Sequence, residues 1–323
     1  MPLISFVVPC YNEQDSLPLF CEELAQAVET MNDTYDDLRY EALFVDDGSH
    51  DSTLDIIEHL AQDDLPFTVR WIAFSRNFGK EAALYAGLSH ARGDYVATMD
   101  ADMQDPPSLI PQMYALLLEK DCDNVATRRY NRKGEPRVRS FFARRFYHLI
   151  NRISDTEIVN GARDFRLMRR RMVDAILSVG EYNRFSKGIF SWVGFKTEWI
   201  SYENTERAAG TSRWNFWSLF KYAVEGIVGY STLPLTVAAF VGSIVSLIAI
   251  VFLVVVVVRA LLFGDPVSGW PSLMSVILLL GGLQILFLGV LGQYLAKTYL
   301  ETKHRPLYVI RESSDDADAQ QTG

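Results

Sequence analysis

Two long apolar stretches without a charged residue constrain this chain more than any other feature of its sequence. Residues 235–258 read LTVAAFVGSIVSLIAIVFLVVVVV, and residues 273–291 read LMSVILLLGGLQILFLGVL. A helix needs about 20 apolar residues to cross the hydrocarbon core of a bilayer. We therefore predict an integral membrane protein with two spanning helices, at about residues 233–259 and 272–296, within a membrane region of residues 232–299.

The basic residues around these stretches predict how the chain crosses the cytoplasmic membrane. The link RALLFGDPVSGWP contains one basic residue, whereas the outer flanks contain Arg213, Lys221, Lys297, Lys303 and Arg305. Basic flanks stay in the cytoplasm, so both termini are expected there and the link outside. Residues 300–323 then form a cytoplasmic tail, whose acidic and polar end (ESSDDADAQQTG) is expected to be disordered. A membrane region of only two helices is also compatible with assembly into a homo-oligomer.

Charge is distributed unevenly over the rest of the chain. Residues 1–127 contain 6 basic and 24 acidic side chains, whereas residues 128–171 contain 14 basic and 4 acidic ones. Such a basic block within an acidic protein favours an anionic partner at that place, with a solvated helix face as the alternative. No nucleic-acid partner is expected.

Two segments have the pattern of helices that lie in the membrane interface. Residues 138–153 (VRSFFARRFYHLINRI) combine apolar residues at helical spacing with arginines on or beside the opposite face. A helix packed on the protein's own core fits this pattern equally well. Residues 214–230 contain six aromatic side chains suited to the interfacial belt, and we predict a juxtamembrane helix over residues 211–231 (Trp214, Phe216, Trp217, Phe220, Tyr222, Tyr230).

The N-terminal half alternates short apolar runs with helical patterns. The apolar runs predict four strands, at residues 4–8, 40–45, 69–74 and 95–99. Helices are predicted at residues 16–30, from Asp51 or Ser52 to Ala61, at 81–91 and at 108–118. This alternation predicts an α/β fold with a doubly wound, mostly parallel sheet. No GxGxxG follows the first strand and no GxxxxGK[ST] is present, which argues against a Rossmann dehydrogenase or a P-loop NTPase.

Polar clusters follow all four predicted strands, at the edge where such sheets bind ligands. Asp100, Asp102 and Gln104 occupy alternate positions after the fourth strand, so an extended backbone points their side chains the same way. Oxygen ligands suit Mg²⁺ or Mn²⁺, which complete their shells with water and substrate phosphates. An ordinary turn is the alternative. Asp46 and Asp47 likewise could accept hydrogen bonds from a nucleobase or ribose, or serve the turn that follows them.

Together these motifs resemble the cytoplasmic catalytic domain of family 2 glycosyltransferases, which have a GT-A fold. More narrowly they resemble the polyprenyl-phosphate sugar transferases, which include dolichyl-phosphate mannose synthase and bactoprenol glucosyltransferase. The matching segments follow the family's order over residues 1–210, and the two predicted spans fit the bactoprenol-type branch: VVPCYNE (7–13), VDDGSHDST (45–53), SRNFGKEAAL (75–84), ATMDADMQDPP (97–107), NGARDFRLMRR (160–170) and ERAAGTSRW (206–214). The QxxRW motif of processive synthases is absent, so a long polysaccharide product is not expected.

The resemblance implies a role for particular residues of this chain. It places in the nucleotide-sugar pocket Pro9, Tyr11, Glu13, Asp46, Asp47, Asn77, Lys80, Asp100, Ala101, Arg207, Ser212 and Arg213. It assigns the metal to Asp100, Asp102 and Gln104, and catalytic roles to Asp164 and Asp102. In the basic block, Arg128, Arg139 and Arg144 are predicted to hold a lipid phosphate.

The implied reaction is inverting, metal-dependent transfer of a single hexose from a nucleotide sugar to polyprenyl phosphate, such as undecaprenyl or dolichyl phosphate, for cell-envelope glycosylation. Glucose from UDP-glucose is favoured, and mannose from GDP-mannose, aminoarabinose and an N-acetylhexosamine are alternatives. A catalytically inactive, membrane-anchored binding protein is the alternative from another class. Because a phosphate monoester is largely ionised at neutral pH, Asp164 is predicted to orient the acceptor or the sugar and not to act as a base; pairing with Arg163 or Arg166 is the structural alternative.

Overall fold

The computed structural model describes residues 1–129, 161–202, 233–263 and 269–315. The chain divides into two compact units. The sheet unit comprises Met1–Asn215 with Arg305–Gly323, and the helical unit comprises Phe216–His304. The interfacial helices predicted at residues 138–153 and 211–231 lie outside the described residues.

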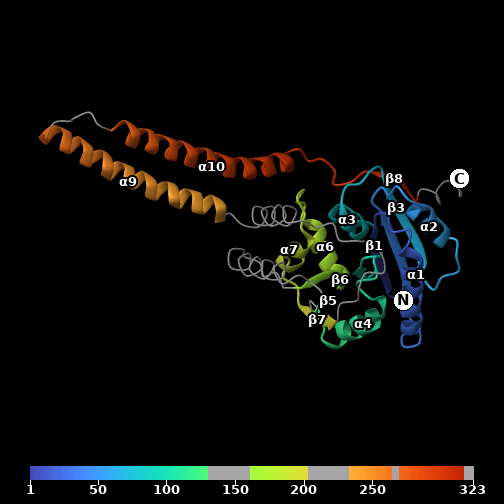
Figure 1. The fold of residues 1–323 in the computed structure, drawn as a ribbon. Helices are drawn as coiled ribbons and strands as arrows, with labels where there is room; N and C mark the ends of the chain where they lie inside the picture. The colour runs from blue at the N-terminus through green and yellow to red at the C-terminus, as the bar shows by residue number, and fades with distance from the viewer. Residues whose placement is uncertain (130–160, 203–232, 264–268, 316–323) are drawn as a thin grey trace. The chain divides into compact units, whose positions relative to one another are not determined.

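The sheet unit is built on an eight-stranded sheet with strand order β7-β5-β6-β4-β1-β2-β3-β8 (Figure 1). Its strands are β1 (Leu3–Cys10), β2 (Arg39–Asp46), β3 (Thr68–Phe74), β4 (Tyr95–Thr98), β5 (Asn124–Arg129), β6 (Ala162–Arg169), β7 (Thr197–Tyr202) and β8 (Ile310–Ser313). Strands β4, β1, β2 and β3 pair in parallel, as do β5 and β7, whereas β6 and β8 run antiparallel to their neighbours. The predicted α/β fold with a mostly parallel sheet is confirmed.

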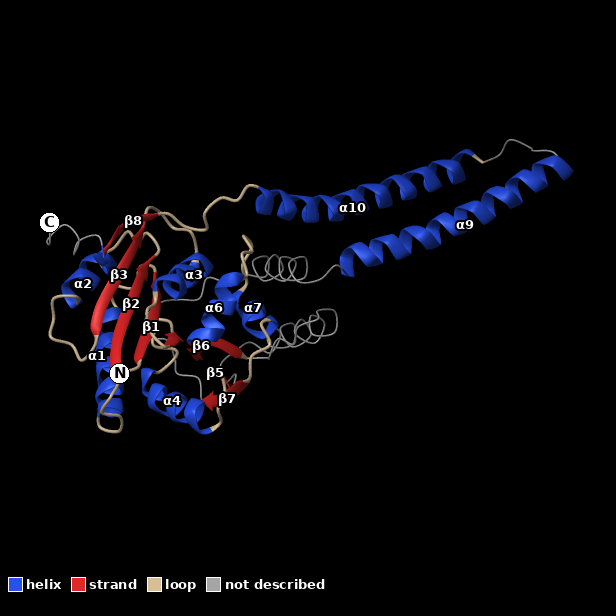
Figure 2. Cartoon of the chain, turned by 180° about the vertical axis from the view of Figure 1, so that it is seen from behind, coloured by secondary structure: helices blue, strands red, loops and turns tan. Residues whose placement is uncertain are grey.

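Helices cover both faces of this sheet (Figure 2). On one face lie α1 (Leu17–Asn32), α2 (Thr53–Leu60) and α4 (Ile110–Glu119), the last preceded by the 3-10 turn η1 (Pro107–Leu109). On the other lie α3 (Lys80–His90), α6 (Arg170–Ser178) and α7 (Ser186–Trp192). Strand β1 shows why both faces are covered: Phe6 and Val8 belong to the first core and Val7 to the second, because successive side chains point to opposite faces.

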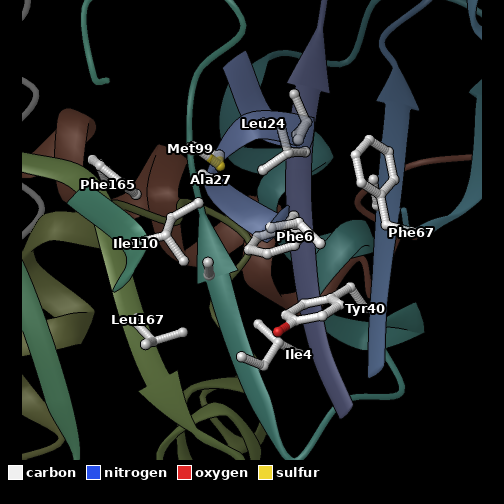
Figure 3. Packing of buried hydrophobic residues seen from close by; sticks show 14 of the residues in the cluster. Ile4, Phe6, Leu24, Ala27, Tyr40, Phe67, Met99, Ile110, Phe165 and Leu167 are labelled. Atoms are coloured by element: carbon white, nitrogen blue, oxygen red, sulfur yellow. The ribbon is translucent and has the colours of Figure 1, made fainter. Parts of the chain in front are cut away.

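The core joins the two halves of the sheet into one body. Figure 3 shows Ile4, Phe6 and Tyr40 grouped together, and the Phe6 and Tyr40 rings stack with centroids 6.3 Å apart. Phe165 and Leu167 of β6 belong to the same cluster. Burying one such large side chain stabilises the fold by roughly 1.5–3 kcal/mol. Strand β6 is therefore held by the same core as the predicted strands, although it is far from them in sequence.

The chain returns to the sheet after the helical unit. Strand β8 pairs with β3, and Asp315 accepts two hydrogen bonds from the Arg70 guanidinium, at 3.1 and 2.7 Å. A third, from Arg92 Nη2, measures 3.0 Å. The prediction of a disordered tail from Glu312 is therefore wrong for residues 312–315, because strand pairing and these two arginines hold them.

The helical unit contains α9 (Leu233–Phe263) and α10 (Trp270–Thr302). Both are long and apolar enough to cross a membrane, over Pro234–Phe252 and Leu279–Thr302, and no residue of these two windows is buried within the protein. Phe240 and Leu247, for example, are 67% and 62% exposed. Such apolar surfaces are unusual on a soluble monomer, which supports the prediction of two spanning helices.

Candidate active site

The candidate site lies at the carboxyl ends of β1, β2, β3 and β4, where their loops meet. Strand β6 reaches the same edge with its amino end, because it runs antiparallel to β4. Thr98 Oγ1 at the end of β4 donates a hydrogen bond to the carbonyl oxygen of Asp164, at 2.5 Å. Asp164 is thereby placed beside Asp100, although 64 residues separate them in the sequence.

Lys80 joins these two carboxylates. Its Nζ lies 2.6 Å from Asp100 Oδ1 and 2.8 Å from Asp164 Oδ2. The side chains of Asp100 and Asp164 are 21% and 16% exposed, and that of Lys80 is 43% exposed. Predicted residues from three separate segments therefore form one charged cluster that remains open to solvent on the lysine side.

The protonation of this cluster follows from its surroundings. Burial raises the pKa of Asp100 above its ordinary value, and Asp164 raises it further. Burial alone would also raise the pKa of Asp164, but the positive charges of Lys80, Lys187 and Arg166 outweigh it and hold that pKa well below its usual range. Asp164 is therefore ionised at neutral pH.

Asp47 shapes the loop that presents Lys80. Its carboxylate accepts hydrogen bonds from the backbone N–H groups of Phe78, at 2.6 Å, and Gly79, at 2.9 Å. Gly79 has φ of 98° and immediately precedes Lys80, the first residue of α3. Of the two roles that the sequence left open for Asp47, the structure shows the loop-forming one.

Gly48 allows two neighbouring loops to come close together. Its φ is +69°, and a Cβ atom built on it would lie 2.5 Å from the backbone carbon of Arg76. Only glycine fits both the left-handed conformation and this approach. At Gly48 the backbone of the loop after β2 therefore lies directly against the backbone of the loop after β3, next to the hydrogen bonds that Asp47 makes.

The loops after β1 and β2 are joined by hydrogen bonds. Asn12 N–H donates to Ser49 Oγ at 2.9 Å, His50 N–H donates to Asn12 Oδ1 at 2.9 Å, and Glu13 N–H donates to Thr53 Oγ1 at 2.8 Å. Buried Asp46 accepts hydrogen bonds from the N–H and hydroxyl groups of Ser49, and burial raises its pKa.

These loops bring predicted nucleotide-binding residues to the same edge. Pro9 pairs with Val45 in the sheet, next to Asp46. Tyr11 is 42% exposed and Asn77 is also exposed, whereas Ala101 is buried. Tyr11 and Asn77 therefore face solvent just after β1 and β3, at the edge of the sheet where Asp100 follows β4.

The predicted metal ligands lie in the loop after β4. Asp102 Oδ1 accepts a hydrogen bond from Gln104 N–H at 3.1 Å, and Met103 between them has φ of 60°. Gln104 Oε1 accepts one from Arg163 Nη2 at 3.4 Å. Among the described residues no three His, Cys, Asp or Glu side chains converge as a ready-made metal site. The prediction that an extended backbone points the three side chains the same way is therefore wrong, because this loop is a turn. Its oxygen donors are still of the kind that Mg²⁺ or Mn²⁺ takes together with substrate phosphates.

Arg163 pairs with Asp105 and not with Asp164, the partner that the sequence left open. It binds Asp105, which is fully buried, through Nε at 2.9 Å and Nη2 at 3.1 Å, and Tyr202 Oη donates to the same carboxylate. The suggested pairing of Asp164 with Arg163 or Arg166 is therefore wrong, since the salt-bridge partner of Asp164 is Lys80.

Of the remaining residues predicted to bind the donor or the lipid phosphate, one lies in the described part of the chain and five lie outside it. Arg128 lies on β5, opposite Ala162 of β6, and its Nε donates to Ser201 Oγ at 2.9 Å. Arg139, Arg144, Arg207, Ser212 and Arg213 lie outside the described residues.

Sequence reasoning missed Lys187, whose charge acts on Asp164. Glu81 fixes the start of α7, where Lys187 lies, because its carboxylate accepts hydrogen bonds from the neighbouring Ser186, from N–H at 2.9 Å and from Oγ at 2.5 Å. No spacing or composition in the segment RFSKG distinguishes this lysine from a surface lysine, so no sequence signal pointed to it.

These observations define an α/β domain with a charged edge site, in a chain that also has two candidate membrane helices. The comparison with known sequences identifies its class. The chain belongs to glycosyltransferase family 2: the family described as "Glycosyl transferase family 2" matches residues 5–177. The protein is accordingly a glycosyltransferase.

Relatives extend this similarity over nearly the whole chain. It is 42% identical to the bactoprenol glucosyl transferase of Shigella phage SfV, over 95% of this chain and 98% of the relative. The same values hold for the prophage bactoprenol glucosyl transferase homolog of Escherichia coli K12. Among solved structures, glucosyl-3-phosphoglycerate synthase from Mycobacterium tuberculosis, in complex with Mn²⁺, uridine-diphosphate-glucose and phosphoglyceric acid, is 18% identical with a TM-score of 0.43, covering 70% of this chain and 78% of its own.

Proposed function

We propose that this glycosyltransferase moves a single hexose, most favourably glucose from UDP-glucose, to polyprenyl phosphate at the cytoplasmic face of the membrane, with inversion at the anomeric carbon. The observation that carries the proposal is the 42% identity, over nearly the full length, to relatives named bactoprenol glucosyl transferases. The same chain combines a charged site at a sheet edge with two candidate spans, as a soluble donor and a lipid acceptor require.

Asp100, Asp102 and Gln104 would hold a divalent cation, Mg²⁺ or Mn²⁺. When bound, such an ion offsets the negative charge that develops on the leaving diphosphate. The oxygen-only donor set after β4 supports this assignment. Lys80 supplies a second positive charge at the same edge, already positioned by Asp47 through the start of α3.

The acceptor needs little help to become a nucleophile. A phosphate monoester has a second pKa of about 6, so it is mostly dianionic at pH 7. In the proposed step its oxygen forms a bond to the anomeric carbon while the bond from that carbon to the diphosphate breaks. No proton must be removed, and the weakly basic Asp164 suits orientation of the sugar or the acceptor.

The pairing of β8 with β3 supports the proposed topology. Strand β3 precedes both candidate spans in the chain, and β8 follows them. Two strands can pair only in one compartment, so the chain crosses the membrane an even number of times between them. This agrees with two spans and with both termini in the cytoplasm, as the basic flanks predict.

The direct test uses the full-length protein in detergent with undecaprenyl phosphate, Mn²⁺ and a panel of nucleotide sugars. We expect a lipid product heavier than the acceptor by one hexose, fastest from UDP-glucose, with inverted anomeric configuration by NMR. Faster transfer from another donor would correct the sugar alone. Absence of any glycosylated lipid with all donors would refute the proposal and favour a binding protein without catalysis.

A further inference from the structure

A cavity of about 180 Å³ lies over strands β5, β6 and β7, against α7. The side chains lining it include Asn124, Arg166, Lys187, Phe190, Ser191 and Trp199. Two of these are cations, and no acidic side chain lines the cavity among the described residues. The cavity is therefore electropositive, which favours an anionic ligand.

Arg166 is the cation that requires an explanation, because its side chain is buried at 3% exposure. Its guanidinium lies 3.6 Å over the Phe190 ring, and Nη2 donates to the carbonyl oxygen of Arg163 at 3.0 Å. In the part of the chain that the structure describes, its Nε has no hydrogen-bond partner. Within the described chain no carboxylate lies at salt-bridge distance from it, and burial lowers its pKa to about 10. A buried guanidinium without a carboxylate at salt-bridge distance is costly to folding. The more distant charge of Asp164 acts on Arg166, and an anionic ligand in the cavity would supply a closer partner.

The cavity adjoins the candidate active site. Asp164 and Arg166 are two residues apart on β6 and so share a face of the sheet, about 6.6 Å apart along the strand. The charges of Lys187 and Arg166 both act on Asp164. Lys80 already pairs with Asp164 and Asp100. Glu81 is a third carboxylate that interacts with Lys80 and Asp164, so the charges around Asp164 are nearly balanced. Among the described residues, the charged side chains that line the cavity itself are the two cations Lys187 and Arg166.

We propose that this cavity is an anion subsite that takes a phosphate monoester, and that during transfer it holds the phosphate of the lipid acceptor beside Asp164. The second part rests on the proposed function. Arginine and lysine together suit a phosphate, since the guanidinium offers a fork of donors and the ammonium a point charge. Arg128, which pairs with the cavity residue Ala162, lies next to the cavity and extends this basic surface.

The test introduces a negative charge into the cavity of the full-length protein. Ser191 lines the cavity and is partly exposed, so Ser191→Asp opposes a bound phosphate without removing a core side chain. We expect the KM for undecaprenyl phosphate to rise at least about tenfold, the effect of about 1.4 kcal/mol, while the KM for the nucleotide sugar stays within about twofold. Ser178→Asp, which adds the same charge at an exposed position on α6, is the matched control and should behave as the wild type.

A second variant removes one cation. Lys187→Gln should also raise the KM for the lipid phosphate, whereas Lys120→Gln, at the exposed end of α4, should not. Inorganic phosphate should inhibit the wild type competitively with the lipid and inhibit Ser191→Asp much less. Thermal unfolding of each variant separates loss of binding from loss of folding.

The outcomes separate this inference from the proposed function. If the wild type glycosylates the lipid but Ser191→Asp and Ser178→Asp have the same KM for it, the subsite is refuted while the function stands. If the wild type glycosylates no lipid, the function fails; calorimetric binding of inorganic phosphate that Ser191→Asp abolishes would then keep the anion subsite and assign it a soluble phosphate. Inhibition by phosphate that is competitive with the nucleotide sugar would overturn the acceptor assignment.

Discussion

Replacing Asp164 by asparagine tests whether this carboxylate is a general base. In the structure, Asp164 Oδ2 accepts a hydrogen bond from Lys80 Nζ at 2.8 Å. Asparagine keeps an oxygen that can accept this bond but loses the negative charge. A hydrogen bond to a charged group contributes about 1.5–3 kcal/mol, so loss of the charge should lower kcat/KM by roughly 10- to 100-fold. Losing the base of a proton-transfer step would cost up to about 10⁴-fold.

The pH profile gives the sharper distinction. Lys80 and the other cations hold the pKa of Asp164 below the usual carboxyl range. The Lys80–Asp164 ion pair is therefore fully formed at any pH above the ordinary carboxyl pKa, and it is lost only when the pH falls through the lowered pKa of Asp164. It is intact from pH 6 to 8 and contributes no titration there. The acceptor phosphate, with a pKa of about 6, should then give kcat/KM a rise with the same midpoint in wild type and Asp164→Asn.

The assay measures transfer to undecaprenyl phosphate at saturating nucleotide sugar between pH 5 and 8.5. Asp121→Asn removes a carboxylate that is 84% exposed, and it serves as the control for a surface charge. A loss near 10⁴-fold in Asp164→Asn, together with disappearance or displacement of the rise, would refute the orienting role and restore the base.

Three further predictions concern the metal and the stability of the sheet unit. Excess chelator should abolish transfer, and added Mn²⁺ or Mg²⁺ should restore it; undiminished transfer in chelator would contradict the metal assignment. Arg70→Met removes the salt-bridge partner that lies 3.0 Å from buried Glu41, and it should lower the free energy of unfolding by about 3–5 kcal/mol. Asp315→Asn changes a side chain that is 39% exposed and should lower it by less than about 1 kcal/mol. Equal losses for the two variants in chemical denaturation would contradict this prediction. Gly48→Ala should destabilise the protein and weaken nucleotide binding measured by calorimetry, whereas Gly180→Ala, with open space around it, should do neither.

The strands that the sequence predicts are the continuous apolar ones. β1 to β4 are buried on both faces, so nearly all their side chains must be hydrophobic. The resulting continuous apolar runs can be recognised in the sequence. β6 reads ARDFRLMR and β8 reads IRES, so neither shows an apolar run. Their place in the sheet depends on pairing with distant strands, which a local pattern does not contain.

The candidate site, too, could be predicted from the sequence only in part. Asp100 and Asp46 were predicted because they end apolar strands, and the structure places them at the expected edge. The pairing of Lys80 with Asp164 depends on the antiparallel course of β6 and on the loop that Asp47 holds. The cavity around Arg166 depends on three strands and a helix meeting, so no single segment of the sequence could indicate it.

Strand β8 also affects how the protein is made. It follows α10 in the chain, so a ribosome releases it only after both apolar helices have been synthesised. Until then the outer edge of β3 remains unpaired, and Arg70 lacks Asp315. With the proposed topology, completion of the sheet unit is coupled to membrane insertion: a chain whose second helix failed to return across the bilayer would leave β8 on the wrong side and the sheet unfinished.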